Sequence, residues 1–404
     1  MTSQVVIMSK IAAAVASDSS VTFSGSERPP RSYPTAEKIV PLEAPHRIAV
    51  LHNGSTDLLR VPYAVLLQEW AVSIPEPFST VRQYAESFAT WVEQQAGLFD
   101  DSNQCWFLEW VLRDYLLAAR SDVLDACRDR FIPPQEWTSE AASDILREVF
   151  TSRLEYLNTM SRFERPDPAA VRHYLESHEE SVERVIEWVF DDTPRSQEGD
   201  KLLRELCETL LGVSEPFSSD AELVFVGFGT DELFPASQCL DIFGIIADHL
   251  RTLLRTYERV STDDPVYISP YAQTEAMNTF LRGYHPDVLQ ATHENLDEAL
   301  SADSDGGALA PEDLRAHHDA LTKRVEEVSW KKFINPMLDT VAGLPAVELA
   351  RTAEALVRLQ VLRKLTQAEA ETVGGPIDVG LLTRKSGFTW CRHKSLLTEL
   401  AIEP

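Results

Sequence analysis

The sequence predicts a mixed α/β fold of the α+β kind, in which strands from both ends of the chain form a layered core and helical segments are inserted between them. Short apolar runs bounded by turn residues occupy residues 2–61 and 221–246, whereas residues 62–220 have helical periodicity. The chain has 404 residues, enough for two or three domains or for one core with large insertions. Its 44% of hydrophobic and 25% of charged residues are typical of a globular protein.

The N-terminal region is expected to form strands. Four short apolar runs, each bounded by turn residues, lie at 3–8, 11–16, 38–42 and 47–52. Asn53-Gly54 ends the last of them. The stretch 24–36 is rich in proline and contains a glycine, so we expect a loop there.

The block 62–220 is expected to be helical. In its clearest helix, Val81, Tyr84 and Phe88 recur at helical spacing. Ser79 is the expected N-cap of this helix, and Gly97 marks its expected end. Four more helices are expected at 106–119, 139–160, 169–190 and 201–211. Most aromatic residues of this block stand in such apolar stripes, which favours a place in the core over a role in binding a cofactor.

Strands return after residue 220. Two apolar runs within 221–246 are separated by a polar turn, which predicts a hairpin. Gly227-Phe228-Gly229 is too short for a dinucleotide-binding loop. The remaining elements are expected to be helices at 273–283, 287–340 (with a loop at 301–310) and 345–365, then a strand at 374–382 and a hairpin that continues to 388–390.

Composition excludes several classes of partner. The net charge of −27 repels phosphate backbones, so we expect no direct binding to nucleic acid. No run of about 18 apolar residues occurs, so no membrane span is expected, and the N-terminus lacks the pattern of a signal peptide. The five cysteines contain no CxxC pair, which predicts reduced thiols in a cytoplasmic protein and neither a disulfide frame nor a metal site. No sequence pattern calls for a cofactor.

Four residues near the N-terminus suggest nucleophilic catalysis. Thr2 is small enough for Met1 to be removed, and the freed α-amine can then act as the base for its own hydroxyl. Downstream, Lys38 offers an ammonium that favours proton loss from the hydroxyl, and Asp18 offers a carboxylate that keeps this lysine charged. Gly54 follows a strand, where its unhindered N–H can donate to an oxyanion.

The order of these residues resembles that of proteasome β-subunits, which are N-terminal nucleophile (Ntn) hydrolases. TSQVVI at 2–7 is similar to the first strand of the family, and AVASDSSVT at 14–22 is similar to its AADSRVT segment, with no gap between Thr2 and Asp18. Lys38 and Gly54 match the active-site lysine and the oxyanion glycine. LVFVGFG at 223–229, ISPYAQT at 268–274 and ETVGGPIDV at 371–379 resemble later segments, and similar GFG and ETVGGPIDV segments are typical of bacterial proteasome-like chains of unassigned role.

The resemblance covers less than half of the chain and implies a four-layer αββα Ntn-hydrolase sandwich. It implies a discontinuous core of residues 2–64, 221–286 and 344–404, with helical insertions at 65–220 and 287–343. The supporting polar residues of the family fall near Gln273 or Thr274 and near Glu371 and Thr372. Val373 departs from the family pattern, because it cannot replace a serine.

The resemblance implies a threonine-type hydrolase of the peptidase kind, whose catalytic residues are Thr2, Asp18, Lys38 and Gly54. Its substrate would be a peptide or protein, and the chain would form a homo-oligomer. Because GxxxxGK[ST] is absent, any unfolding activity would come from a separate ATPase or unfoldase. Two alternatives remain open: a non-catalytic binding or assembly protein on the same fold, and a hydrolase of small amides.

Overall fold

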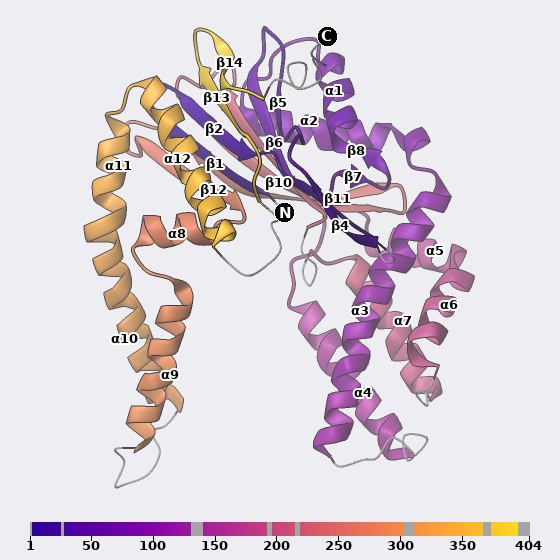
Figure 1. Ribbon diagram of the computed structural model, residues 1–404. Helices are drawn as coiled ribbons and strands as arrows, with labels where there is room; N and C mark the ends of the chain where they lie inside the picture. The colour runs from indigo at the N-terminus through magenta and orange to yellow at the C-terminus, as the bar shows by residue number, and fades with distance from the viewer. Residues whose placement is uncertain are drawn as a thin grey trace.

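Two antiparallel sheets form the centre of the molecule (Figure 1). The computed structural model describes residues 2–25, 28–130, 140–191, 196–214, 219–302, 311–366 and 373–394. Within these ranges, the first sheet has five strands in the order β12-β1-β2-β13-β14, and the second has five in the order β11-β10-β9-β6-β5. The fold is thus of the mixed α/β class that the sequence predicts.

The bounds of the ten sheet strands are β1 Ser3–Ser9, β2 Ala13–Asp18, β5 Ile39–Pro41, β6 Arg47–Gly54, β9 Ala221–Phe228, β10 Ala236–Ile246, β11 His249–Arg259, β12 Val266–Ala272, β13 Ile377–Thr383 and β14 Gly387–Arg392. Two small hairpins are formed by β3 Val21–Gly25 with β4 Arg28–Tyr33, and by β7 Asp57–Leu58 with β8 Val61–Pro62.

The bounds of the helices are α1 Tyr63–Ser73, α2 Val81–Gln94, α3 Asp101–Asp129, α4 Glu140–Asn158, α5 Pro168–Ser177, α6 Glu179–Phe190, α7 Gln197–Leu211, α8 Glu275–Arg282, α9 Pro286–Ala302, α10 Pro311–Ser329, α11 Asn335–Ala342 and α12 Ala346–Leu365. A 3-10 turn covers Ala96–Leu98, and a π-helical turn at Trp330–Ile334 joins α10 to α11. Among the described residues, no helix has both the length and the apolar character needed to cross a bilayer.

The two sheets pack face to face through one apolar cluster. Because side chains alternate along a strand, Val6 and Met8 of β1 point to the inner face. They pack there with residues of the second sheet that include Leu51 of β6 and Val226 of β9. This packing holds β1 against the second sheet, and the first described residues, Thr2 and Ser3, are buried.

Each sheet is covered on its outer face by helices. Val5 and Ile7 of β1 pack under α12, and the small side chains of Ala14 and Ala16 in β2 allow this helix to lie close to the sheet. The outer face of the second sheet packs against α1 and α2, where Trp70 meets Phe225 with ring centroids 5.7 Å apart. Helix, sheet, sheet and helix therefore succeed one another across the core.

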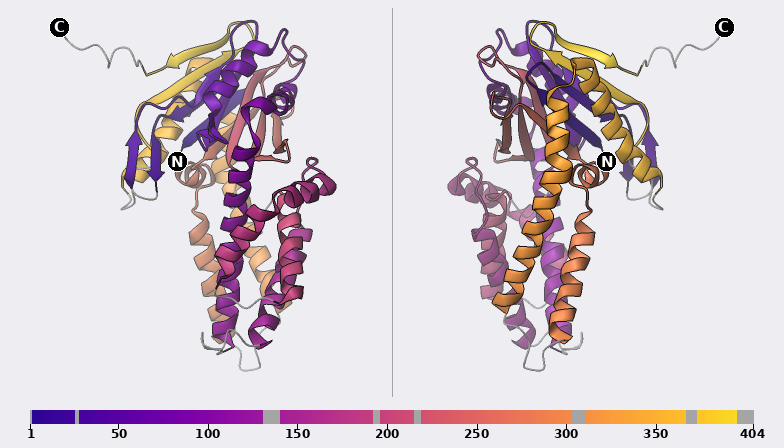
Figure 2. Two further views of the ribbon diagram at one scale, coloured as in Figure 1. Left: turned by 90° about the vertical axis from the view of Figure 1, so that its right-hand side faces the viewer. Right: turned by 90° about the vertical axis from the view of Figure 1, so that its left-hand side faces the viewer.

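Two groups of helices project from the same side of the sheets, as Figures 1 and 2 show. One group contains α3 to α7, and its apolar residues continue the cluster that covers the second sheet. The other is the pair α9 and α10, which follows α8 and leads into α11. The described residues next to the N-terminus lie between the bases of these two groups in Figure 1.

Most predicted strands and helices are present, including the hairpin β9–β10 and the C-terminal pair β13–β14. The strands β11 and β12 were absent from the prediction. Both lie at sheet edges, where charged residues such as Arg255 and a proline such as Pro270 are tolerated because one side of the strand needs no partner. These residues weaken the apolar alternation by which a strand is recognised.

Three further expectations are corrected. The loop expected at 24–36 contains most of the hairpin β3–β4, whose prolines are accommodated in a two-stranded ribbon. The helix expected at 169–190 is broken at His178 into α5 and α6. The N-cap of α2 is Thr80 rather than Ser79, because Thr80 and Gln83 form a capping box. Most of the loop expected at 301–310 lies outside the described residues.

Candidate active site

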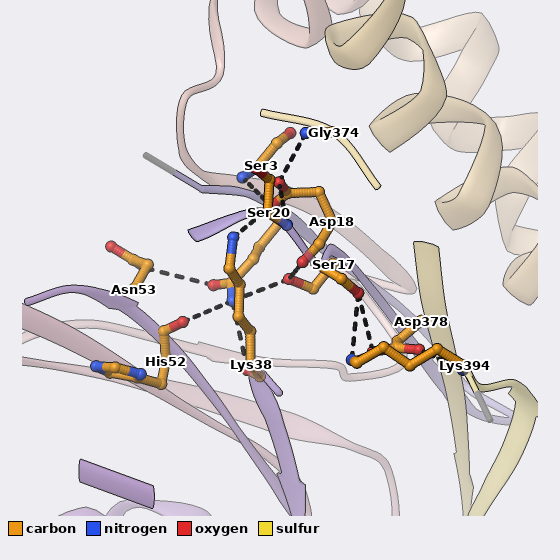
Figure 3. A network of polar contacts seen from close by, with 12 residues as sticks. Ser3, Ser17, Asp18, Ser20, Lys38, His52, Asn53, Gly374, Asp378 and Lys394 are labelled. Carbon is orange, nitrogen blue, oxygen red and sulfur yellow. Dashed lines mark hydrogen bonds and ion pairs between the residues drawn. The ribbon is translucent and has the colours of Figure 1, made fainter. Parts of the chain in front are cut away.

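The carboxylate of Asp18 is the centre of a buried polar network at the end of β2 (Figure 3). Oδ1 accepts the N–H of Ser3 at 2.9 Å, and Oδ2 accepts the N–H groups of Ser20 at 3.2 Å and Gly374 at 3.1 Å. Asp18 is only 1% exposed. Three backbone donors thus hold one carboxylate in place and join β1 and β2 to the segment before β13.

The ammonium group of Lys38 binds this carboxylate, with Nζ 2.8 Å from Oδ1 of Asp18. Lys38 immediately precedes β5, and its carbonyl oxygen accepts the N–H of His52 at 3.0 Å. Burial lowers the pKa of Lys38 from its ordinary value, an effect that Asp18 opposes and that the charge of Lys394 adds to. The structure therefore brings Asp18 and Lys38 together, as the sequence suggests.

Thr2 is buried beside this pair. It directly precedes β1, and its carbonyl oxygen accepts the N–H of Gln273 at 2.9 Å. The next residue, Ser3, donates its N–H to Asp18. The peptide unit that follows Thr2 is therefore fixed on both of its polar groups, by Gln273 after β12 and by the Asp18 carboxylate.

Gly54 ends β6 in a conformation that favours glycine. Its φ is +90°, and a Cβ at this position would lie 2.5 Å from the carbonyl oxygen of Asp220. Backbone N–H groups alternate in direction along a strand. The N–H of His52 donates toward Lys38 and that of Ser55 donates to Asp220, so the N–H of Gly54 faces the Lys38 side.

Three of these four candidate residues line one pocket of about 290 Å³, and Asp18 lies behind Lys38. Thr2, Lys38 and Gly54 are among its walls, together with Ser20 and Ser55. A hydroxyl, a buried ammonium and a backbone segment that offers an N–H therefore border the same space. This combination can activate a nucleophile and stabilise a negative charge that develops on a bound carbonyl.

A second network of side chains stabilises the backbone around the pocket. The Gln4 side chain donates through Nε2 to the carbonyl of His52 at 2.9 Å, and Asn53 donates to Glu222 at 2.8 Å. Nε2 of His52 lies 2.6 Å from the carbonyl oxygen of Ser55. Burial lowers the pKa of His52 to about 4, so its imidazole is neutral at pH 7. The sequence gives no signal for Gln4 and Asn53, because their partners lie on other strands.

A further buried ion pair lies beside the site and was absent from the prediction. The ammonium of Lys394 binds the carboxylate of Asp378 in β13 and donates to Ser19 Oγ at 3.2 Å. Ser19 also donates to Asp378 at 3.3 Å. Figure 3 places this pair on the opposite side of Ser17 and Asp18 from His52 and Asn53.

The supporting residues expected from the resemblance make different kinds of contact. Gln273 contacts Thr2 through its backbone N–H. Thr274 directly precedes α8 without a side-chain capping bond, and its hydroxyl accepts from the side-chain amide of Asn278 at 2.8 Å. Glu371 and Thr372 lie outside the described residues. Val373 is buried, next to the Gly374 N–H that binds Asp18.

One cluster of metal-ligand types occurs in the described part of the chain. Glu222, Cys239 and Asp241 each offer an atom within 4.8 Å of the others. The Glu222 carboxylate already accepts from Asn53, and Arg255 binds Asp241 at 2.7 Å. The cluster is thus a satisfied polar network of the protein itself. All five cysteines are free thiols.

No protein-family model matches this chain, and no curated protein matches it. Among solved structures, it is similar to an Anbu (Gly-1) mutant from Hyphomicrobium sp. strain MC1, with 9% sequence identity and a TM-score of 0.26. That similarity covers 98% of this chain and 86% of the other. A TM-score this low assigns neither fold nor function, so the function is inferred from the geometry of the site.

Proposed function

We propose that this chain is a threonine-type Ntn hydrolase that cleaves peptide bonds with Thr2, after removal of Met1. The observation that carries the proposal is the buried Lys38–Asp18 ion pair in the wall of a pocket that Thr2 also lines. A buried ammonium stabilises the alkoxide form of a nearby hydroxyl, because few water molecules screen its charge. Met1 itself lies outside the described residues.

In the proposed reaction, the α-amine of Thr2 removes the proton from its own hydroxyl while Oγ1 forms a bond to the carbonyl carbon of the substrate. An α-amine has an ordinary pKa of about 7.7–8.0, which suits a general base near neutral pH. The C–N bond then breaks, and the leaving amine takes the proton back from the α-ammonium. Water hydrolyses the ester on Thr2 by the same proton route and regenerates the hydroxyl.

The N–H of Gly54 stabilises the oxyanion of this reaction. Its direction toward the Lys38 side of β6, inferred from the strand alternation, supports the assignment. Asp18 acts on Lys38, because its carboxylate holds the ammonium in one position and is itself held by three backbone N–H groups. Gln273 positions Thr2 through the backbone, and Thr274, Glu371 and Thr372 remain proposed supporting residues.

The proposed fold is the αββα sandwich of Ntn hydrolases. The succession of helix, sheet, sheet and helix layers supports it. We assign the core to residues 2–64, 221–286 and 344–404, and the insertions to 65–220 and 287–343. Helices α1 and α2 fall mostly within the first insertion, yet they form the helical layer on the second sheet.

We further propose that the substrate is a peptide or protein and that the chain forms a homo-oligomer. Exposed apolar side chains on the outer helix α12, among them Val347 and Leu362, support association through this layer. A separate ATPase or unfoldase would deliver folded substrates. The non-catalytic alternative is favoured by one observation: the buried apolar Val373 stands where the resemblance calls for a polar residue.

The proposal is tested by peptide hydrolysis with two neighbouring substitutions. Wild-type protein is incubated with a panel of fluorogenic peptides, and Thr2→Ala and Ser3→Ala are compared with it. Ser3 Oγ is buried and has no hydrogen-bond partner, so Ser3→Ala is a matched control that should retain activity. Activity that survives in Thr2→Ala would contradict the proposal, as would an intact mass with Met1 retained in nearly all molecules.

A further inference from the structure

A second pocket, of about 450 Å³, adjoins the candidate active site. The two pockets share Gly54 and Ser55 in their walls. The second pocket extends from these residues toward α3, so its lining combines the second sheet with one of the projecting helices. Nothing in the reaction proposed above uses this space.

A buried cation lines the second pocket. Arg251 of β11 is only 1% exposed, and its guanidinium lies over the rings of Phe107 and Phe163 at 5.7 Å and 5.5 Å. It donates to the carbonyl oxygens of Phe243 and Leu211, but its Nε has no partner. No carboxylate of the described residues forms an ion pair with it, although the charge of Asp220 acts on it from a longer distance. Burial lowers the pKa of Arg251 to about 9, so it is still charged at pH 7.

An acidic group lines the same pocket. Asp220 accepts from the hydroxyl of Tyr63 at 3.5 Å, a long hydrogen bond. Burial raises the pKa of Asp220 to about 6, so most of it is ionised at pH 7. The pocket therefore contains a buried cation and a buried anion that attract each other but form no ion pair at contact distance. Burial makes each charge costly, and each would be stabilised further by an opposite charge on a ligand.

The remaining walls are mainly apolar. Phe107 and Trp110, one turn apart on α3, have stacked rings with centroids 5.9 Å apart, and both line the pocket with Phe243. Trp110 is 42% exposed, so part of this wall faces solvent. Asp114 lies one turn further along the helix and is also exposed. Aromatic walls of this kind bind apolar groups of a ligand.

We propose that this pocket binds an α-amino acid with an apolar side chain. The carboxylate of the ligand pairs with Arg251, its ammonium pairs with Asp220, and its side chain packs against Phe107 and Trp110. A zwitterion offers an opposite charge to both buried groups at once, which neither a simple carboxylate nor a simple amine does. The inference does not require that the chain hydrolyses anything, because Thr2 and Lys38 take no part in this pocket.

The ligand chemistry is tested by isothermal titration calorimetry of the full chain. L-phenylalanine is compared with phenethylamine, which lacks the carboxylate, and with 3-phenylpropionate, which lacks the amine. We expect each analogue to bind roughly tenfold more weakly or worse, since each loses a charged hydrogen-bonded contact. Glycine, which has no side chain to pack against Phe107 and Trp110, is the control ligand and should bind weakly. Absence of binding by L-phenylalanine at millimolar concentrations, or equal affinity for all three aromatic compounds, overturns the proposal.

The location of the site is tested with two tryptophans of α3. Trp110→Ala should weaken binding of L-phenylalanine roughly two- to tenfold through loss of the aromatic contact. Trp106→Ala is the matched control, because Trp106 is similarly exposed at 46% but lies outside the pocket, over Arg60. Thr2→Ala should bind like wild type, which separates this site from the proposed reaction. Equal effects of the two tryptophan substitutions would place the ligand elsewhere.

Discussion

Nζ of Lys38 lies 2.8 Å from Oδ1 of Asp18, and both side chains are almost completely buried. The same carboxylate also accepts three backbone N–H groups, from Ser3, Ser20 and Gly374. Its position is therefore set by the backbone, and the lysine is placed relative to it. Since this carboxylate also binds the N–H of Ser3, which follows Thr2, the ion pair links the stability of the site to the position of Thr2.

Replacing Lys38 tests this link. Lys38→Met leaves a buried carboxylate without its counter-ion, so we expect a loss of about 3–5 kcal/mol in the free energy of unfolding, together with loss of peptide hydrolysis. Lys38→Arg keeps the charge and should cost less stability. It should still abolish hydrolysis, because a guanidinium is larger and planar. Urea denaturation and peptide turnover measure the two effects.

The double variant Asp18→Asn with Lys38→Met is the control for stability. It removes both charges, so part of the stability lost in Lys38→Met should return. Wild-type turnover by Lys38→Arg would show that the lysine has only a structural role.

The dependence of stability on pH reports on His52 and Asp220. His52 has a pKa of about 4 in the folded protein against an ordinary 6.5. As the pH falls from 6.5 to 4, the unfolded chain therefore binds a proton that the folded chain does not, and stability falls by up to about 3 kcal/mol. The contribution of Asp220 to stability changes with pH in the opposite direction. Its folded pKa is about 6 against 3.8, so the folded chain binds the proton first and stability rises by a similar amount as the pH falls.

The two contributions nearly cancel in the wild type, so single variants separate them. In urea titrations between pH 4 and pH 7, His52→Gln should gain stability on acidification relative to wild type. Asp220→Asn should lose stability over the same range. Identical pH profiles for wild type and His52→Gln would mean that this imidazole is not kept neutral by burial.

The sequence predicts the four catalytic candidates because their order along the chain resembles a known family. The structure brings Asp18 and Lys38 into contact and places Thr2 and Gly54 in one pocket wall with Lys38. The partners of these residues could not be predicted, since they depend on which strands become neighbours. Gln4 contacts His52 only because β1 of one sheet faces β6 of the other. The edge strands β11 and β12 were missed for a local reason, their charged residues and proline.

The second pocket could not be predicted from the sequence for the same reason: its walls come from elements that meet only in the folded chain. Arg251 lies on β11, which the sequence does not indicate as a strand. It meets α3 of the helical block only in the folded chain, through Phe107. A lone arginine in a polar stretch suggests a solvated side chain, whereas the packing buries it.

Gly54 and Gly97 provide a matched pair of glycine substitutions. Gly54→Ala forces a Cβ to within 2.5 Å of the Asp220 carbonyl at a φ of +90°, so we expect a loss of roughly 1–3 kcal/mol and of hydrolysis. A Cβ at Gly97 would meet nothing within 4 Å, and its φ lies outside the left-handed region. Gly97→Ala should therefore leave stability within about 1 kcal/mol of wild type. Thermal unfolding and peptide turnover compare the two; equal effects would contradict a special role for Gly54.

An electrophile that joins a hydroxyl and an amine on adjacent carbons tests the nucleophile directly. If Met1 is removed, Thr2 alone among the threonines offers both groups, so a peptide epoxyketone should modify the chain once, at Thr2. Labelling of Asp18→Asn should be slow, because Lys38 loses the carboxylate that holds its ammonium beside the pocket. The rate of adduct formation by intact mass and the modified residue by peptide mapping provide the measurement.

Two controls make this labelling experiment decisive. Thr2→Ala should not react, whereas Ser3→Ala should react like wild type, because Ser3 keeps its N–H bond to Asp18 and loses only an unpartnered hydroxyl. A binding pocket without catalytic function would not distinguish Thr2 from Ser3 in this way, since neither hydroxyl would be activated. Adducts on interior residues such as Ser19, together with hydrolysis that persists in Thr2→Ala, would exclude an N-terminal nucleophile.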